Sequence, residues 1–251
     1  MPLFLLHKAT NMKKLLFTTL IFSTLLVSCR FFDGKRIKGN GVIKTESRTV
    51  DSFSGIRVSG NADVYVKQDS IYSVKVETDE NLLPYLLTTN SNGSLDIHQK
   101  EGTNLNPSKT IKVYVSGPSF KRFDASGACD FFSENRIVSN EPVHIQLSGS
   151  SDVKMDIKAP GISADLSGSG TIALRGESKN FTVSGSGSTD VKCFDLLTEN
   201  TEVNISGAGD AEVFASVKLD VQVSGSGDVK YKGNATVNQS ISGAGSVKKV
   251  E

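Results

Sequence analysis

The sequence predicts an all-β protein folded as a right-handed parallel β-helix, a solenoid of stacked coils. Composition is the first observation: the 251 residues include 23 Gly and no Trp, which favours many tight turns over helices. The second is a short unit that recurs along the chain, a Ser-Gly turn between runs of alternating apolar residues. Internal repetition at about 20 residues is the signature of a solenoid.

The repeat is most regular over residues 121–251. Apolar residues recur two and four positions before each turn glycine and four positions after it, the period of strands with one buried face. In the turn that begins at Ser184 we take Gly185 as the aligned glycine. Ser188 and Thr189 are then a two-residue insertion after it, which leaves the inward and outward faces unchanged. The turns, including an early copy, are Ser59-Gly60, Ser126-Gly127, Ser148-Gly149, Ser167-Gly168, Ser184-Gly185, Ser206-Gly207, Ser224-Gly225 and Ser242-Gly243.

A single unit of this size cannot bury its own apolar face, whereas parallel strands stacked ~4.8 Å apart bury a continuous column. The usual chirality of parallel crossovers predicts a right-handed path. We expect residues 45–120 to form irregular, looped-out coils of the same β-helix domain (45–251), about three of them between Gly60 and Gly127, with one or two helical turns at 79–87. In the last coil, Gln239 and Lys249 occupy apolar columns and predict a polar end cap.

The N-terminal segment predicts export and lipid attachment. Residues 1–28 read as a signal peptide, with Met12 as the expected true start, so that 1–11 would be a mis-assigned extension. The leader ends in Leu-Val-Ser before Cys29, which resembles a bacterial lipobox and makes Cys29 the predicted lipidation site. Two or three acyl chains give a firm anchor. We expect a tether at 29–44 and a place in the cell envelope, with the outer membrane favoured and the membrane face open.

Charge excludes one class of partner. The chain has 28 Lys and Arg against 27 Asp and Glu, and three of the Lys precede Cys29. The mature protein is therefore close to neutral, which gives no electrostatic basis for binding nucleic acid.

Every turn has a serine before its glycine, which permits two interpretations. The serines could form a ligand-binding ladder or supply a nucleophile. No His recurs beside them, so we interpret them as turn residues whose hydroxyls satisfy backbone groups. No catalytic or cofactor-binding residue is predicted.

An acidic column follows the glycines, including Asp63 and Asp130. Its simpler interpretation is that turn carboxylates accept hydrogen bonds from nearby backbone amides. Calcium, which needs six to eight oxygen ligands, is the alternative, although no metal or cofactor is expected. The calcium candidates are Asp152, Asp190, Asp210 and Asp228.

Two cysteines remain after Cys29. Cys129 and Cys193 lie about three coils apart, well beyond the ~7 Å that a disulfide spans between Cα atoms. We expect two free thiols, with Cys193 buried in an apolar column. Zinc needs more Cys and His than the chain offers.

These features resemble the bacterial family of auto-transporter adhesin head GIN domains. The carriers are the lipobox at Cys29, the segment Phe53-Ser54-Gly55-Ile56-Arg57-Val58-Ser59-Gly60 and the series of Ser-Gly turns. The resemblance covers roughly residues 49–251. It implies a right-handed β-helix without catalytic residues and a role in adhesion.

We therefore predict a lipid-anchored, non-catalytic envelope protein that contacts a glycan, a matrix or a surface protein. One alternative is a polysaccharide lyase or hydrolase on the same fold, which would need acids and a Lys or Arg base on one face. Another is a purely structural or regulatory envelope protein. The ligand and the oligomeric state are left open.

Overall fold

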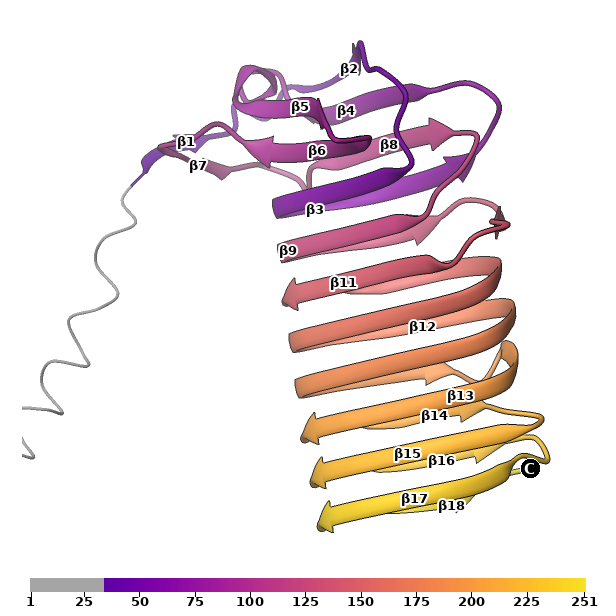
Figure 1. The fold of residues 1–251 in the computed structure, drawn as a ribbon. Helices are drawn as coiled ribbons and strands as arrows, with labels where there is room; N and C mark the ends of the chain where they lie inside the picture. The colour runs from indigo at the N-terminus through magenta and orange to yellow at the C-terminus, as the bar shows by residue number, and fades with distance from the viewer. Residues whose placement is uncertain (1–33) are drawn as a thin grey trace, which may run out of the picture.

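The computed structural model describes residues 34–251, which form a tall stack of strands with a smaller cap at its N-terminal end (Figure 1). The predicted signal peptide, the start at Met12 and the lipid site at Cys29 lie outside these residues. The predicted all-β class is confirmed: a 16-stranded, mostly parallel sheet is accompanied by a two-stranded sheet. Within residues 34–251 no helix is long and apolar enough to cross a membrane.

The stack is built from parallel strands that lie one on the next in chain order. Its strands are β9 (Arg122–Ser133), β10 (Ile137–Val138), β11 (Val143–Gly149), β12 (Val153–Cys193), β13 (Leu196–Gly207), β14 (Ala211–Phe214), β15 (Lys218–Gly225), β16 (Asp228–Lys232), β17 (Thr236–Gly243) and β18 (Ser246–Lys249). Figure 1 shows β13, β15 and β17 in a front row and β14, β16 and β18 behind them. Each repeat therefore contributes to both rows.

One glycine of each repeat lies directly on the glycine of the next. At Gly225 the backbone φ is 136°, and an added Cβ would meet the carbonyl oxygen of Gly207. Only glycine adopts this conformation without strain and permits this approach. The stacked residues are Gly60, Gly127, Gly149, Gly168, Gly187, Gly207, Gly225 and Gly243.

The structure corrects the alignment of the repeats at the fourth stacked glycine within residues 121–251. Gly187, not Gly185, has the positive φ and pairs with Gly207. Gly185 instead pairs with Ile205 and is buried at an inward position. Its missing side chain makes room for Thr189, whose hydroxyl lies where a Cβ would be. Ser188 and Thr189 are thus ordinary turn residues, not an insertion.

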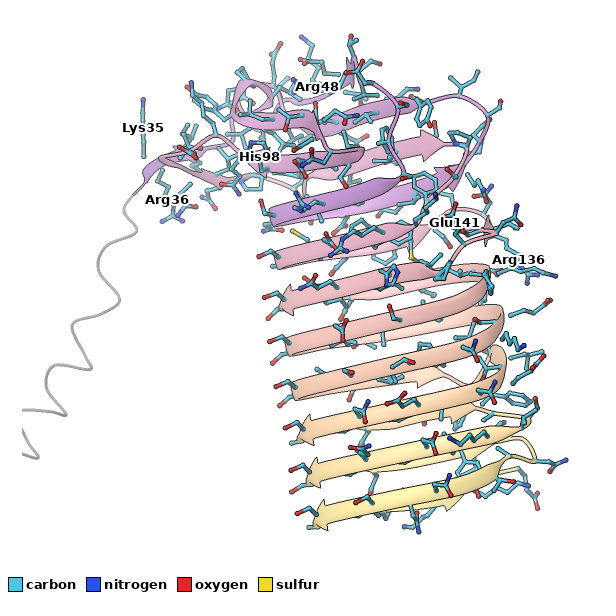
Figure 2. The ribbon with its side chains drawn as sticks, viewed as in Figure 1. Lys35, Arg36, Arg48, His98, Arg136 and Glu141 are labelled. Carbon is cyan, nitrogen blue, oxygen red and sulfur yellow. The ribbon has the colours of Figure 1, made fainter. Side chains whose placement is uncertain are left out.

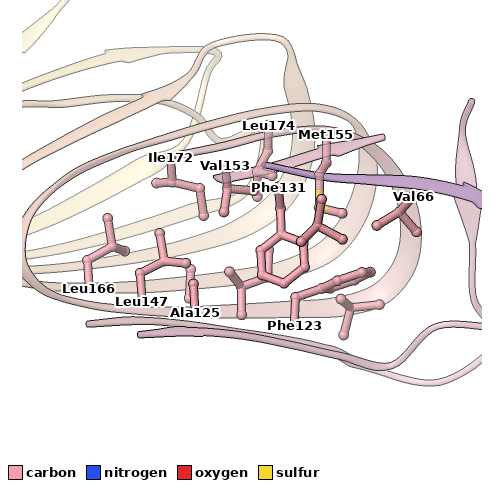
Figure 3. Packing of buried hydrophobic residues seen from close by; sticks show 14 of the residues in the cluster. Val66, Phe123, Ala125, Phe131, Leu147, Val153, Met155, Leu166, Ile172 and Leu174 are labelled. Carbon is pink, nitrogen blue, oxygen red and sulfur yellow. The ribbon is translucent and has the colours of Figure 1, made fainter. Parts of the chain in front are cut away.

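The core lies between the two rows of strands. Figure 3 shows Leu147 and Leu166 on one side pointing towards Val153 and Ile172 on the other. All four are at most 4% exposed. The alternation predicted from sequence therefore places two apolar columns face to face, and with the corrected alignment Val191 joins the second of them.

The N-terminal region differs from the expected looped-out coils. β3 (Gly55–Gln68) pairs directly with β9, Gly60 on Gly127, so no repeat lies between them. The intervening chain turns back over the end of the stack, and much of it is antiparallel. The strands are β2 (Ile43–Arg48), β4 (Ser73–Asp79), β5 (Leu86–Ser91), β6 (Ser94–Gln99) and β8 (Lys112–Gly117), with β2–β4, β4–β8 and β5–β6 antiparallel.

This region works as a cap for the core. The helix expected at 79–87 is a single 3-10 turn, η1 (Leu83–Tyr85), with Pro84 in its first turn. Around it, Leu82, Leu83 and Leu86 are at most 3% exposed and belong to the same core cluster as the stack. Three leucines in five residues cover the open end of the core better than another strand, which would turn every second side chain outward.

The chain from Gly34 to Lys44, expected as a tether, is paired instead. β1 (Lys35–Lys38) forms the separate two-stranded sheet with β7 (Thr103–Asn106). The following turn is fastened by Asp79, a fully buried carboxylate that accepts hydrogen bonds from the Gly41 amide (2.7 Å), the Ser108 amide (2.8 Å) and the Ser108 hydroxyl (2.7 Å). The N-terminal end of the stack is therefore covered and held.

At the other end, Gln239 pairs with Val221 and Lys249 pairs with Tyr231, as the apolar columns predicted. The last repeat places polar side chains where earlier repeats have apolar ones. It thus ends the core without a cap of its own.

Candidate binding face

A groove crosses the outer face of the front row of strands. It has a volume of about 920 Å³ and is open to solvent, within the ~300–1,000 Å³ typical of ligand sites. Figure 2 shows this face towards the viewer, with mostly short side chains along the strands. The groove is lined by Gln146, Ser148, Asp165, Ser167, Ser184, Ser186, Glu202, Asn204, Ser206, Gln222, Ser224, Ser240 and Ser242, with backbone or side-chain atoms of Leu147, Leu166, Gly185, Ile205 and Val223.

Six members of a serine ladder form one side of this groove. Its members precede the stacked glycines, so Ser186 belongs to it and Ser184 does not. The ladder is Ser59, Ser126, Ser148, Ser167, Ser186, Ser206, Ser224 and Ser242, all exposed except the half-buried Ser59.

The interpretation that these hydroxyls satisfy backbone groups is wrong for the residues in the structure, because none of the eight hydroxyls donates or accepts a hydrogen bond there. The turn backbone is already satisfied between repeats. For example, the Ala208 amide donates to the Gly187 carbonyl at 2.9 Å, and the Ser226 amide donates to the Gly207 carbonyl at 2.9 Å. The hydroxyls are therefore free to meet a ligand.

A second line of polar side chains runs beside the ladder, at the outward positions between buried residues. Gln146 and Gln222 are exposed, and the Asn204 side-chain amide donates to Glu202 at 3.0 Å. Sequence reasoning did not single out these residues. Their only signal was their place between the apolar columns, which is the outward face of the strands.

Towards the cap, the same face becomes charged. Arg122 contacts Asp124 at 2.8 Å and Gln146 at 3.1 Å, and Arg57 contacts Asp96 at 3.0 Å. The groove itself has only the carboxylates of Asp165 and Glu202, and no Lys, Arg or His lines it among the described residues. It is thus a site for hydrogen bonding more than for charge pairing.

Three carboxylates of the acidic column accept hydrogen bonds from backbone amides. Asp130 accepts from the Asp152 amide at 2.8 Å, Asp152 accepts from the Thr171 amide at 2.7 Å, and Asp210 accepts from the Asp228 amide at 3.0 Å. This is the simpler of the two interpretations made from the sequence. Each carboxylate thereby joins one repeat to the next.

The four calcium candidates do not form a metal cluster. Asp190, Asp210 and Asp228 line one small depression together with Lys192 and Lys230. The Ser246 hydroxyl donates to Asp228 at 2.7 Å, and this hydrogen bond lowers the pKa of that carboxyl. Across residues 34–251, no group of three or more His, Cys, Asp or Glu is arranged to hold a metal ion.

Cys129 and Cys193 are free thiols and Cys193 is buried, as predicted, and the structure shows that Cys129 is buried as well. Burial raises the pKa of Cys129 to about 11 and that of Cys193 to about 12. Neither thiol is available for chemistry at neutral pH, because the thiolate is the reactive form.

An aromatic ladder lies on the back row near the cap. The Tyr65 ring stacks on Tyr114 at 5.2 Å and on Phe132 at 5.3 Å between ring centroids. No motif in the sequence marks this alignment of rings from separate strands. The faces of the Tyr65 ring are covered by its neighbours, so the ladder serves packing more than it offers a flat platform to a sugar ring.

Solved structures share this architecture. A crystal structure from Bacteroides fragilis, described as "a putative adhesin", is 19% identical, with a TM-score of 0.80 over 85% of this chain and 100% of that one. A Parabacteroides distasonis structure, described as "Putative lipid binding protein", is 28% identical, with a TM-score of 0.67 over 86% and 100%. A Parabacteroides merdae structure, described as "a putative adhesin", is 24% identical, with a TM-score of 0.66 over 86% and 100%.

No curated protein matches the chain. The family model described as "Putative auto-transporter adhesin, head GIN domain" matches residues 52–235. This range begins just before β3 and ends just before β17, so it contains most of the cap and nearly all of the stack. The chain therefore belongs to the family of auto-transporter adhesin head GIN domains.

Proposed function

We propose that this protein is a lipid-anchored, non-catalytic adhesin of the cell envelope that binds a glycan in the serine-lined groove. The free hydroxyl ladder is the observation that carries the proposal. Six exposed serines of the ladder line the groove in register beside side-chain amides, and their hydroxyls make no hydrogen bond to another described residue. A repeating row of small donors and acceptors suits a polymer that repeats its own hydroxyl groups.

The fold that presents this groove is, we infer, a right-handed parallel β-helix in which each repeat is one coil. The in-register glycine stack and the two facing apolar columns support it. A right-handed path is the usual one for parallel crossovers. The resulting scaffold is rigid, so the groove keeps its shape without a ligand.

The groove favours a neutral glycan. Asp165 and Glu202 would repel uronic acids or sulfates, and no basic side chain among the lining residues offsets them. The backbone of a neutral polysaccharide can instead exchange hydrogen bonds with Gln146, Gln222 and the serines. An extended chain lying along the stack would cross several repeats at once.

A lyase or hydrolase is the second candidate from the sequence. A lyase needs a base positioned beside acids. The groove has two carboxylates and no Lys or Arg among its described residues, which supports a binding role over this chemistry. A purely structural envelope protein remains the third candidate, and it predicts no ligand at the groove.

The anchor rests on sequence. The signal peptide at 1–28 and the lipobox ending at Cys29 support export and diacylation, with the outer membrane as the favoured location. Metabolic labelling with an alkyne fatty acid tests the anchor: wild type takes up label, and Cys29→Ser does not. Protease added to intact cells tests whether the groove faces the outside.

Binding is tested on an array of neutral and acidic glycans with two matched triple variants. Asn204→Ala/Gln222→Ala/Ser206→Ala removes donors from the groove, and Lys154→Ala/Lys192→Ala/Lys230→Ala changes the opposite face. We expect the first to weaken binding at least tenfold, because each lost hydrogen bond is worth ~0.5–1.5 kcal/mol, and the second to have no effect. Equal loss in both variants, or release of unsaturated products from uronic-acid polymers with calcium present, would contradict the proposal.

A further inference from the structure

The β1–β7 pair carries a cluster of unpaired basic side chains. Lys35, Arg36 and Lys38 lie on β1, and Lys100 lies just before β7. All four are exposed. None of them forms an ion pair with another residue of the described chain. Residues 34–38 and 100–106 are called the basic flap below; Glu101 is its one acidic residue.

The basic flap stands apart from the rest of the molecule. Figure 1 shows β1 and β7 projecting from the side of the cap, next to the point where the described chain begins. In Figure 2 the labelled side chains of Lys35 and Arg36 point away from the flap in different directions. Ile37 on β1 pairs with the buried Leu105 on β7, and both side chains pack on the core side of the flap. The charged groups are left for a partner.

The cationic groups are not needed by the fold. Some other basic side chains of the cap are ion-paired: Lys44 contacts Glu80 at 2.9 Å, and Arg48 contacts Glu46 at 3.0 Å. The flap differs in that it gathers several basic side chains without such a partner. A projecting cluster of one sign is a site for the opposite charge.

Chain length places this cluster near the bilayer. Four residues lie between Cys29 and Gly34, so the two are five residue steps apart, and an extended chain spans at most ~3.3–3.6 Å per step. An acylated Cys29 would therefore hold the flap within ~18 Å of the lipid head groups. Electrostatic attraction decays over ~8 Å at physiological ionic strength, so docking of the flap against the surface needs only a bent linker.

We propose that the basic flap is the membrane-facing surface of this protein and docks on anionic lipid head groups beside the anchor. This inference rests on the proposed lipidation of Cys29. The acyl chains hold the protein in the membrane, and the flap orients it. The cap is then fixed against the bilayer through Lys35, Arg36 and Lys38, and the stack is prevented from tumbling freely about its linker.

The test uses the full mature lipoprotein in vesicles that carry a head-group quencher. A fluorophore on Asn104→Cys reports on the flap, and one on Ala244→Cys reports on the last repeat of the stack; both positions are exposed. Cys129 and Cys193 are buried and do not compete for the label. Vesicles contain phosphatidylcholine alone or with phosphatidylglycerol.

We expect the flap probe to be quenched more strongly with phosphatidylglycerol than without it, and the stack probe to differ little. Each basic residue near an anionic surface changes the docking equilibrium by about fivefold. Lys35→Glu/Arg36→Glu/Lys38→Glu should therefore abolish the extra quenching, as should high salt. Lys192→Glu/Lys248→Glu/Lys249→Glu, with the same charge change on the stack, should leave it intact.

Equal quenching of the flap probe in both kinds of vesicle, or unchanged quenching in the flap variant, overturns the docking while the anchor stands. Intact mass reports the acyl chains separately. If the mature protein carries no acyl chains, both the lipid anchor and the docking of the flap are contradicted. Glycan binding is tested separately by the glycan array.

Discussion

The backbone amide of Asp152 donates a 2.8 Å hydrogen bond to the carboxylate of Asp130, one repeat away. The same contact links Thr171 to Asp152 and Asp228 to Asp210. These three carboxylates are tolerated in a column of like charges because each compensates a backbone donor of its neighbour.

We expect this column to work without a cation. The melting temperature should be the same in calcium and in EDTA, whereas Asp210→Ala should lower it by removing the acceptor of the Asp228 amide. Differential scanning calorimetry measures both. A rise in the melting temperature with calcium that Asp210→Ala abolishes would show that the column binds the ion.

Asp63 is the carboxylate of this column whose replacement should stabilise the protein. Burial and the neighbouring Asp130 raise its pKa, so the native state holds this proton more tightly than the unfolded chain does. Stability is then lost as the pH rises from the unfolded pKa of ~4 through the native pKa. Asp63→Asn should raise the melting temperature at pH 7 and have little effect at pH 3. Asp228→Asn, at a carboxyl whose pKa the Ser246 hydroxyl lowers, should have the opposite effect at pH 7.

Asp79 should contribute stability that acid removes. Burial raises its pKa, but the hydrogen bonds from Ser108 and Gly41 outweigh burial and the net pKa is lowered. This contribution is complete above the unfolded pKa of ~4 and is lost as the pH falls through the native value. Asp79→Asn should destabilise the protein by ~1.5–3 kcal/mol at pH 7, measured by denaturant unfolding. Ser108→Ala should cost less, and a neutral effect of Asp79→Asn would contradict the role of the buried carboxylate.

The glycine stack should not tolerate a methyl group. In Gly207→Ala the new Cβ would meet the Gly187 carbonyl oxygen at a φ of 127°, and the strain and overpacking together should cost ~3 kcal/mol. Gly161→Ala is the matched control, because its Cβ would have no neighbour nearer than 3.8 Å. Thermal unfolding compares the two. Equal melting temperatures would mean that the repeats can separate at the turn.

Both thiols should be unreactive in the native state. Burial raises the pKa of Cys129 to about 11 and that of Cys193 to about 12, so Ellman's reagent should titrate neither at pH 8 and both in guanidinium chloride. Mature wild type and Cys129→Ser/Cys193→Ser give the comparison. Rapid labelling of Cys129 in the folded protein would reveal opening of the stack beside Ser151, whose hydroxyl accepts from the Cys129 amide at 3.3 Å.

The stack was predictable because its apolar columns repeat at period two on both sides of each turn. The period places Val153 and Ile172 in one inward column, and both are buried there. Register was harder in the unit with two consecutive Ser-Gly pairs. Aligning Gly185 or Gly187 preserves which side chains point inward, and the two are separated by the backbone φ and pairing of Gly187 and by the burial of Thr189 against Gly185.

The cap was not predictable from the same signal. Alternation over Val74 and Val76 is the same whether the strand pairs parallel or antiparallel, so the length between Gly60 and Gly127 was read as further repeats. The three leucines at Leu82, Leu83 and Leu86 were noticed only as a helix candidate. The sequence does not decide between a ligand-binding ladder and turn-bonded serines, because a free hydroxyl and a hydrogen-bonded one belong to the same residue type.

The two ends of the stack are unlike, since the cap covers one and the polar β17 and β18 finish the other. Neither end depends on how many repeats lie between them. Duplication or loss of one unit of about 18 residues would lengthen or shorten the molecule by ~4.8 Å while both boundaries stay as they are. Related genes can therefore differ in reach by unequal recombination alone, and a longer copy gains groove at the same rate as it gains height.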